Sequence, residues 1–197
     1  MKTNRFYEET LPEGYREALT LDAGEGKLGA RLAAAAMIVN AASFILIYFL
    51  YARPRMDAIA AAFSVWKCLG FVAAYPLYVV LHELVHGAAY KLLTGRKLTF
   101  GFKPPAAFCG VPDVYAYRVT ALCSLFAPLT VFCVLFAALF FLVPDPFAKA
   151  LFLVLFSFHL SGCVGDLHGI GLYLFRFRGA STLRADTGPK QIFYTKG

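Results

Sequence analysis

The residues best suited to chemistry are His82, Glu83 and His86, which lie inside an otherwise apolar stretch. If this stretch is a helix, the two histidines are four residues apart and project from one face, one turn apart. Two imidazoles at this spacing can bind one zinc ion, and the glutamate beside the first histidine is free to act as a base. The segment His82-Glu83-Leu84-Val85-His86 therefore predicts a zinc site.

The composition indicates that this motif belongs to a membrane protein. Hydrophobic residues make up 59% of the 197 residues, charged residues only 16%, and the mean hydropathy is +0.63. A soluble domain carries roughly 25% charged and 45–50% apolar residues. The net charge of +7 does not indicate a nucleic-acid partner, because the basic residues cluster at the ends of apolar runs and report membrane topology.

Four apolar runs are long enough to cross the hydrocarbon core of a bilayer, which takes about 20 helical residues. They lie at about Arg31–Tyr51, Phe63–Leu93, Val119–Val143 and Phe147–Phe175. We therefore expect an all-α membrane protein with four transmembrane helices in a domain at 31–176, between tails at 1–30 and 177–197. The polar N-terminal tail predicts no cleavable signal peptide, and the odd number of cysteines predicts no disulfide framework.

Basic residues are distributed unevenly around these spans. Fifteen lie in the two tails and the middle loop or at their borders, whereas the other two loops hold only Arg53, Arg55 and Lys149. The fifteen are Lys2, Arg5, Arg16, Lys27, Arg31, Lys91, Arg96, Lys97, Lys103, Arg118, Arg176, Arg178, Arg184, Lys190 and Lys196. The positive-inside rule therefore predicts a multi-pass protein of the cell membrane with both termini and the middle loop in the cytoplasm.

Acidic residues are rare inside the spans, and only Glu83 and Asp166 lie well within them. An acid at the bilayer centre costs roughly 2.5–3.5 kcal/mol on insertion scales, so it usually has a partner or a function. The second and fourth spans run in the same direction, and His86 and Asp166 lie at depths that differ by less than about two turns. Asp166 is therefore a candidate third ligand, with a water as the fourth. The alternatives are a pair with Arg176 or a cap on a broken helix.

Other residues of the fourth span leave alternatives open. His159 lies two turns before Asp166 on the same face, either as a neighbouring or replacement ligand or as a packed, hydrogen-bonded residue of the bundle. His168 points away from Asp166 on an intact helix, which favours an interfacial position. Gly165 and Gly169 allow close helix approach or local unwinding that brings Asp166 to the metal.

The middle loop, from Arg96 to Tyr117, differs in character from the spans. Residues 97–102 alternate in polarity, Pro104-Pro105 cannot continue a central strand, and residues 114–117 favour a second strand. These patterns predict a short β-hairpin or re-entrant segment at the cytoplasmic face, where an exposed strand edge could pair with an extended substrate. An interfacial loop with aromatic anchors is the alternative.

The chain resembles the small bacterial membrane proteins grouped as putative zincin peptidases, distant relatives of the site-2 proteases. The motifs that carry the resemblance run along the chain: residues 11–15 (Leu-Pro-Glu-Gly-Tyr), 82–87 (His-Glu-Leu-Val-His-Gly), 100–103 (Phe-Gly-Phe-Lys), 127–129 (Ala-Pro-Leu), 161–166 (Ser-Gly-Cys-Val-Gly-Asp), 186–188 (Asp-Thr-Gly) and 192–194 (Ile-Phe-Tyr). The resemblance implies that His82, His86 and Asp166 bind the metal and that Glu83 is the catalytic base.

Together these features predict a zinc-dependent, membrane-embedded peptidase with one zinc ion. Its substrate would be a membrane or membrane-proximal protein, with zinc-bound water as nucleophile and Glu83 as general base. Two other functions use the same ligands: a non-enzymatic metal-binding protein that regulates or assembles a partner, and a divalent-metal transporter. The free carboxylate of Glu83 favours the enzyme, and the absence of internal sequence repeats disfavours a transporter.

Overall fold

The computed structural model describes residues 6–22, 26–103, 106–188 and 190–197. The strands are β1 (Tyr7–Glu8), β2 (Tyr15–Asp22), β3 (Thr99–Lys103), β4 (Ala106–Tyr117), β5 (Leu183–Asp186) and β6 (Lys190–Lys196). The helices are α1 (Gly26–Ile47), α2 (Met56–Ala61), α3 (Val65–Thr94), α4 (Arg118–Leu142), α5 (Pro146–Gly162) and α6 (Val164–Gly171). Short π- or 3₁₀-helical turns follow α1 (Tyr48–Ala52, Arg53–Arg55) and α6 (Leu172–Arg176).

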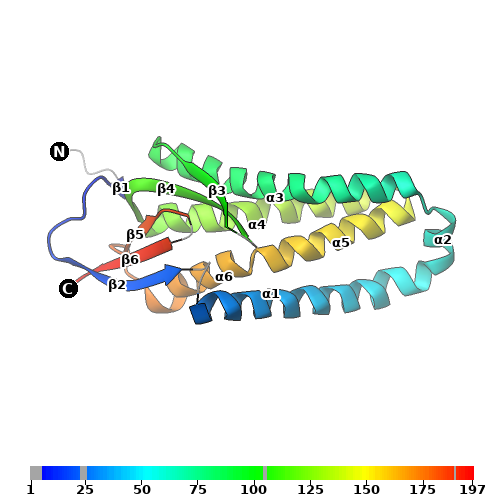
Figure 1. Cartoon of the computed structure of the whole chain (residues 1–197), viewed down its shortest axis with the longest axis horizontal. Helices are drawn as coiled ribbons and strands as arrows, with labels where there is room; N and C mark the ends of the chain where they lie inside the picture. The colour runs from blue at the N-terminus through cyan, green and yellow to red at the C-terminus, as the bar shows by residue number, and fades with distance from the viewer. Residues whose placement is uncertain (1–5, 23–25, 104–105, 189) are drawn as a thin grey trace. The chain divides into compact units, whose positions relative to one another are not determined.

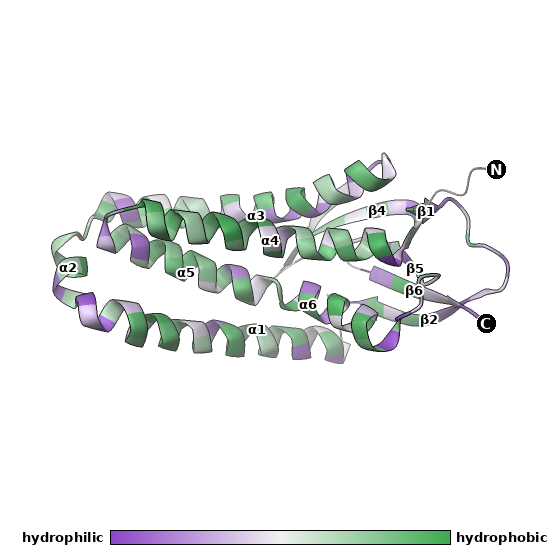
Figure 2. Ribbon diagram, turned by 180° about the vertical axis from the view of Figure 1, so that it is seen from behind, coloured by the Kyte–Doolittle hydropathy of each residue, from purple (hydrophilic) through white to green (hydrophobic). Residues whose placement is uncertain are grey.

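Four helical segments are long and apolar enough to cross a membrane, as the sequence predicted. They are Gly26–Ala61, Val65–Thr94, Arg118–Leu142 and Pro146–Arg176. Figure 2 shows hydrophobic colouring prevailing along α1, α3, α4 and α5. Lengths of 25 to 36 residues exceed the roughly 20 residues that a span requires, so each segment is compatible with a transmembrane helix.

The expectation of an all-α fold is wrong, because the chain also forms a six-stranded antiparallel sheet. The strand order is β1-β4-β5-β6-β2, and β3 pairs with β4. The hairpin expected in the middle loop exists as β3 and β4, in register from Thr99 opposite Gly110 to Lys103 opposite Ala106. The other strands come from the segments expected to be tails, and Figure 1 shows β2 beside β6 although they lie at opposite ends of the chain.

The chain forms two compact units, each with its own packing. The sheet unit holds the described residues of Met1–Leu32, Val80–Pro128 and Gly165–Gly197. The helical unit holds Ala33–Val79 and Leu129–Val164. Helices α3 and α4 each contribute residues to both units.

Two apolar clusters make the core of the sheet unit. One joins α4, α6 and the end of the fourth span to β6, and it is built from Ala121, Leu125, Ile170, Tyr173, Phe177 and Phe193. The other joins α3 to β4 through Tyr90, Val111, Val114 and Ala116. Since both clusters are buried, the sheet is fixed against the helices that carry the candidate site residues.

The helical unit is held by aromatic contacts and a few polar pairs. Asn40 of α1 donates to Ser157 of α5 at 3.2 Å. Lys67 of α3 pairs with Asp145 at 2.6 Å. Asp145 also caps α5 by accepting from the backbone N–H of Ala148, and the pKa of its carboxyl is lowered mainly by the hydrogen bond from Lys67.

The fourth span is interrupted rather than continuous. The first segment, α5, ends at Gly162 with Cys163 as its cap, and α6 begins at Val164, so Asp166 lies in the first turn of a separate helix. Within the sheet unit, Gly169 packs closely on α4, since a Cβ there would lie 3.1 Å from Leu125 Cδ1. Close approach is therefore confirmed at Gly169, and the helix breaks before Gly165, whereas unwinding that serves a metal stays a prediction. All five cysteines are free, as expected.

Candidate metal centre

Helix α3 presents the two histidines of the motif on one face. They are four residues apart in a continuous helix, their ring centroids lie 5.0 Å apart, and their exposed fractions are 7% for His82 and 9% for His86. Imidazoles that are buried in an apolar helix need polar partners. Each of the two rings therefore needs a polar partner from another element.

Asp166 of α6 supplies that partner. One of its carboxylate oxygens, Oδ2, lies 3.4 Å from Nε2 of His82, and the other, Oδ1, lies 3.4 Å from Nε2 of His86. All three residues belong to the sheet unit. The structure thus brings together residues that are 80 positions apart in the sequence.

The spacing of these three donors fits a metal ion. One ligand atom from each of His82, His86 and Asp166 lies within 4.8 Å of the others. Two ligands on a tetrahedral ion, each roughly 2.0–2.2 Å from it, are separated by about 3.3–3.6 Å, which is the separation observed between each histidine nitrogen and its carboxylate oxygen. Two imidazoles and one carboxylate form the ligand set of a catalytic zinc site that keeps one position open.

A backbone carbonyl orients the second histidine. Nδ1 of His86 lies 2.9 Å from the carbonyl oxygen of Ser124 in α4. A carbonyl can only accept, so Nδ1 carries the proton and Nε2 is directed at Asp166. This arrangement is typical of metal-binding histidines, whose other ring nitrogen donates to a carbonyl or carboxylate. Ser124 was not predicted from the sequence.

Glu83 is half-buried next to the ligand group, and strand β4 reaches it. The backbone N–H of Cys109 lies within hydrogen-bonding reach of its carboxylate. Burial, with Glu83 and Asp186 nearby, raises the pKa of the Cys109 thiol to about 12. Burial therefore favours the protonated form of this thiol at neutral pH.

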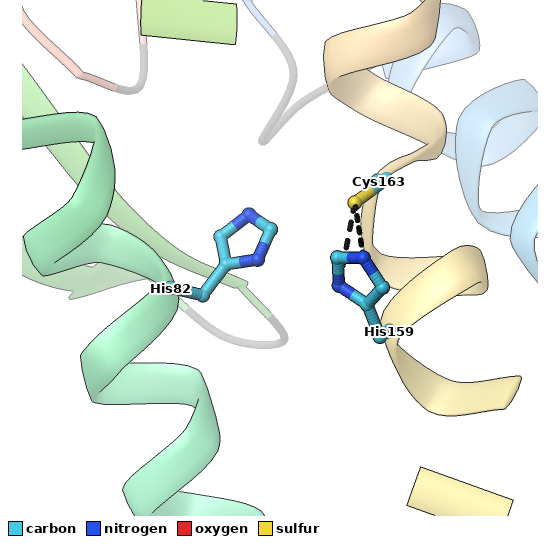
Figure 3. Close-up of side chains that lie close together, drawn as sticks. All are labelled: His82, His159 and Cys163. Atoms are coloured by element: carbon cyan, nitrogen blue, oxygen red, sulfur yellow. Dashed lines mark hydrogen bonds between the residues drawn. The ribbon is translucent and has the colours of Figure 1, made fainter. Parts of the chain in front are cut away.

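The remaining polar residues of the fourth span have other environments. His159 is fully buried in the helical unit, where its ring lies 2.9 Å from the Tyr78 hydroxyl and contacts the Cys163 thiol (Figure 3). These contacts fit the packed, hydrogen-bonded alternative, but His159 and Cys163 also belong, with His82, to a second group of candidate metal donors, so a ligand role for His159 stays a prediction. His168 is half-buried in α6, and within the described residues it belongs to no group of donors close enough to share an ion.

Comparisons with known proteins agree with the geometry. A family model with the description "Putative zincin peptidase" matches residues 75–181, which include the histidine motif, the β3–β4 hairpin and Asp166. No curated protein and no solved structure matches the chain.

Proposed function

The chain belongs to the family described as "Putative zincin peptidase", and from this premise we propose that it is a zinc-dependent, membrane-embedded peptidase. The observation that carries the proposal is the approach of both Asp166 oxygens to the Nε2 atoms of His82 and His86. We propose that these three residues hold one zinc ion. When bound, the ion supplies a Lewis acid that polarises the scissile carbonyl and lowers the pKa of a bound water to about 7.

Glu83 is the proposed general base and acid. Its carboxylate would take a proton from the attacking water and later deliver that proton to the amine that leaves. The backbone N–H of Cys109 lies within hydrogen-bonding reach of this carboxylate and would help to orient it. A structural metal site has no need of such a neighbouring carboxylate, and this favours an enzyme over a purely structural site.

The proposed substrate is an extended segment of a membrane or membrane-proximal protein. Among the described residues β3 pairs only with β4, so its other edge has backbone groups available for a further strand. Strand β3 also lies against α3, the helix that carries His82 and His86, since a Cβ on Gly87 would lie 2.7 Å from the Phe100 ring. A segment added to this edge would run beside the helix turn that carries His86. The charge distribution supports a site near the cytoplasmic side of the cell membrane.

The experiment that tests this function compares Glu83→Gln with the wild type in proteoliposomes, using a fluorescently labelled casein as an extended substrate. We expect cleavage that a chelator abolishes and that added zinc restores. Glu83→Gln should retain zinc and lower the rate by about 10²- to 10⁴-fold, the usual contribution of a general base. Glu13→Gln replaces an exposed glutamate near the N-terminus and is the matched control. This variant should cleave at the wild-type rate. Equal rates for Glu83→Gln and the wild type would exclude the mechanism.

A further inference from the structure

Pro128 lies four residues after Ser124 in the middle of helix α4. In an intact α-helix, the carbonyl of residue i accepts from the backbone N–H of residue i+4. Proline has no N–H, and its ring also presses against the carbonyl of residue i−4. Pro128 therefore deprives the Ser124 carbonyl of its ordinary helical partner.

The freed carbonyl is the one that His86 uses. Its oxygen lies 2.9 Å from Nδ1 of His86, and Ser124, Pro128 and His86 are all buried in the sheet unit. Away from water a carbonyl without a partner is unfavourable, and membrane helices tolerate proline where a neighbouring helix satisfies the freed group. The imidazole N–H of His86 does this here.

We infer that Pro128 is a positioning residue for the metal centre, because it reserves the Ser124 carbonyl for His86. With Nδ1 holding the proton, the lone pair of the neutral ring is on Nε2, the atom that lies 3.4 Å from Asp166 Oδ1. The inference rests on the proposed function only in taking Nε2 of His86 as a zinc ligand. It assigns a role to Pro128 in the Ala127-Pro128-Leu129 segment.

Substitution of Pro128 should maintain or raise the stability of the metal-free protein while it weakens zinc binding. Pro128→Ala restores an N–H that competes with His86 for the Ser124 carbonyl. The helix gains a hydrogen bond, so the metal-free protein should unfold at the same temperature as the wild type or a higher one. The zinc dissociation constant should rise by about 10- to 100-fold, as when an outer partner of a metal-bound histidine is removed. Loss of fold alone cannot produce this combination.

The chain offers a matched control in Pro76, which lies inside α3 and is exposed. Pro76→Ala should also strengthen its helix and should leave the zinc affinity unchanged. Pro128→Gly restores the same N–H with less bulk, so it replaces Pro128→Ala if the alanine variant fails to fold.

The measurements are zinc affinity by chelator competition, thermal unfolding of the metal-free protein, and ¹⁵N NMR of the histidine side chains. The NMR signal of metal-free His86 should show the Nδ1–H tautomer in the wild type and in Pro76→Ala, and a mixture in the Pro128 variants. Unchanged zinc affinity and tautomer in the Pro128 variants would overturn the inference. The tautomer measurement needs neither zinc nor cleavage, so it still decides the role of Pro128 if the wild type proves not to be a peptidase.

Discussion

Gly110 of β4 meets the peptide backbone of Gly188, in the turn between β5 and β6, with no side chain between them. A Cβ on Gly110 would lie 2.4 Å from the Gly188 nitrogen and 2.5 Å from the Thr187 carbonyl carbon. Gly188 also has a positive φ of 97°, which favours glycine. Because Cys109 precedes Gly110 and reaches Glu83, this contact sets where β4 lies beside the candidate base.

We predict that Gly110→Ala destabilises the protein by about 1–3 kcal/mol or more, because the added methyl group meets backbone that cannot rotate away. Thermal unfolding in detergent micelles measures the effect. Gly70→Ala is the control, since a Cβ on Gly70 of α3 meets nothing within 4 Å and alanine favours a helix. A Gly110→Ala variant as stable as Gly70→Ala would contradict the close contact.

Removing either of two proposed zinc ligands, His86 or Asp166, should release the metal. We predict that His86→Ala and Asp166→Ala each weaken zinc binding by more than the roughly 10- to 100-fold typical of outer partners, because each removes a direct ligand. Metal analysis of the purified variants checks this expectation. His168→Ala, from the same short helix as Asp166, should keep stoichiometric zinc. Zinc retained by Asp166→Ala would remove this residue from the ligand set.

The buried hydroxyl of Tyr90 links α3, the helix that carries His82 and His86, to strand β5 by a hydrogen bond. It donates to Asp186 Oδ2 at 2.6 Å, and Arg184 donates to the same oxygen. Tyr90→Phe should lower the free energy of unfolding by about 1–3 kcal/mol, because the buried carboxylate loses a donor without gaining another. Tyr75→Phe, at an exposed position of the same helix, should change the stability little. The comparison of the two unfolding temperatures is the measurement.

The pairing of Tyr117 with Glu8 should make stability depend on pH in the alkaline range. The Tyr117 hydroxyl donates to Glu8 Oε1 at 2.5 Å, and this bond, with burial, raises the pKa of Tyr117 from 10 to about 12. A raised pKa in the folded state means that the contribution is fully present below pH 10 and is lost as the pH rises toward 12. Unfolding temperatures measured from pH 9 to 12 should fall less steeply for Tyr117→Phe than for the wild type. Equal slopes would show that Tyr117 is not the group responsible.

The sequence was sufficient for the spans and for most of the candidate site. Apolar runs of 20 residues or more have few structures open to them in a bilayer, so the four helices could be predicted from length alone. The histidine spacing and the scarcity of buried acids then pointed to Asp166, which the structure brings within 3.4 Å of both histidines. Its assignment as a metal ligand stays a prediction.

Beyond the β3–β4 hairpin the sheet could not be predicted, because β1 and β5 are short and β2 pairs with a strand at the other end of the chain. Strand β5 is only four residues long and buries two charged side chains, Arg184 and Asp186, so its sequence is typical of a polar tail. Strand β2 gains its partner only when Tyr15 lies opposite Lys196, a pairing that no local pattern reports. Ser124 was missed because its backbone carbonyl, and not its side chain, contacts His86. A proline four residues later in an apolar span is nevertheless a sequence signal for a carbonyl without its helical partner.

The pairing of β2 with β6 also bears on the order in which the protein folds. One strand precedes the first span and the other follows the fourth, so the ribosome must synthesise all four spans before the sheet can close. Closing so long a loop is slow compared with forming local helices. Asp186, which accepts a hydrogen bond from Tyr90 of α3, is also synthesised after the fourth span. A nascent chain therefore completes the sheet beside α3 only after all four apolar segments have been made.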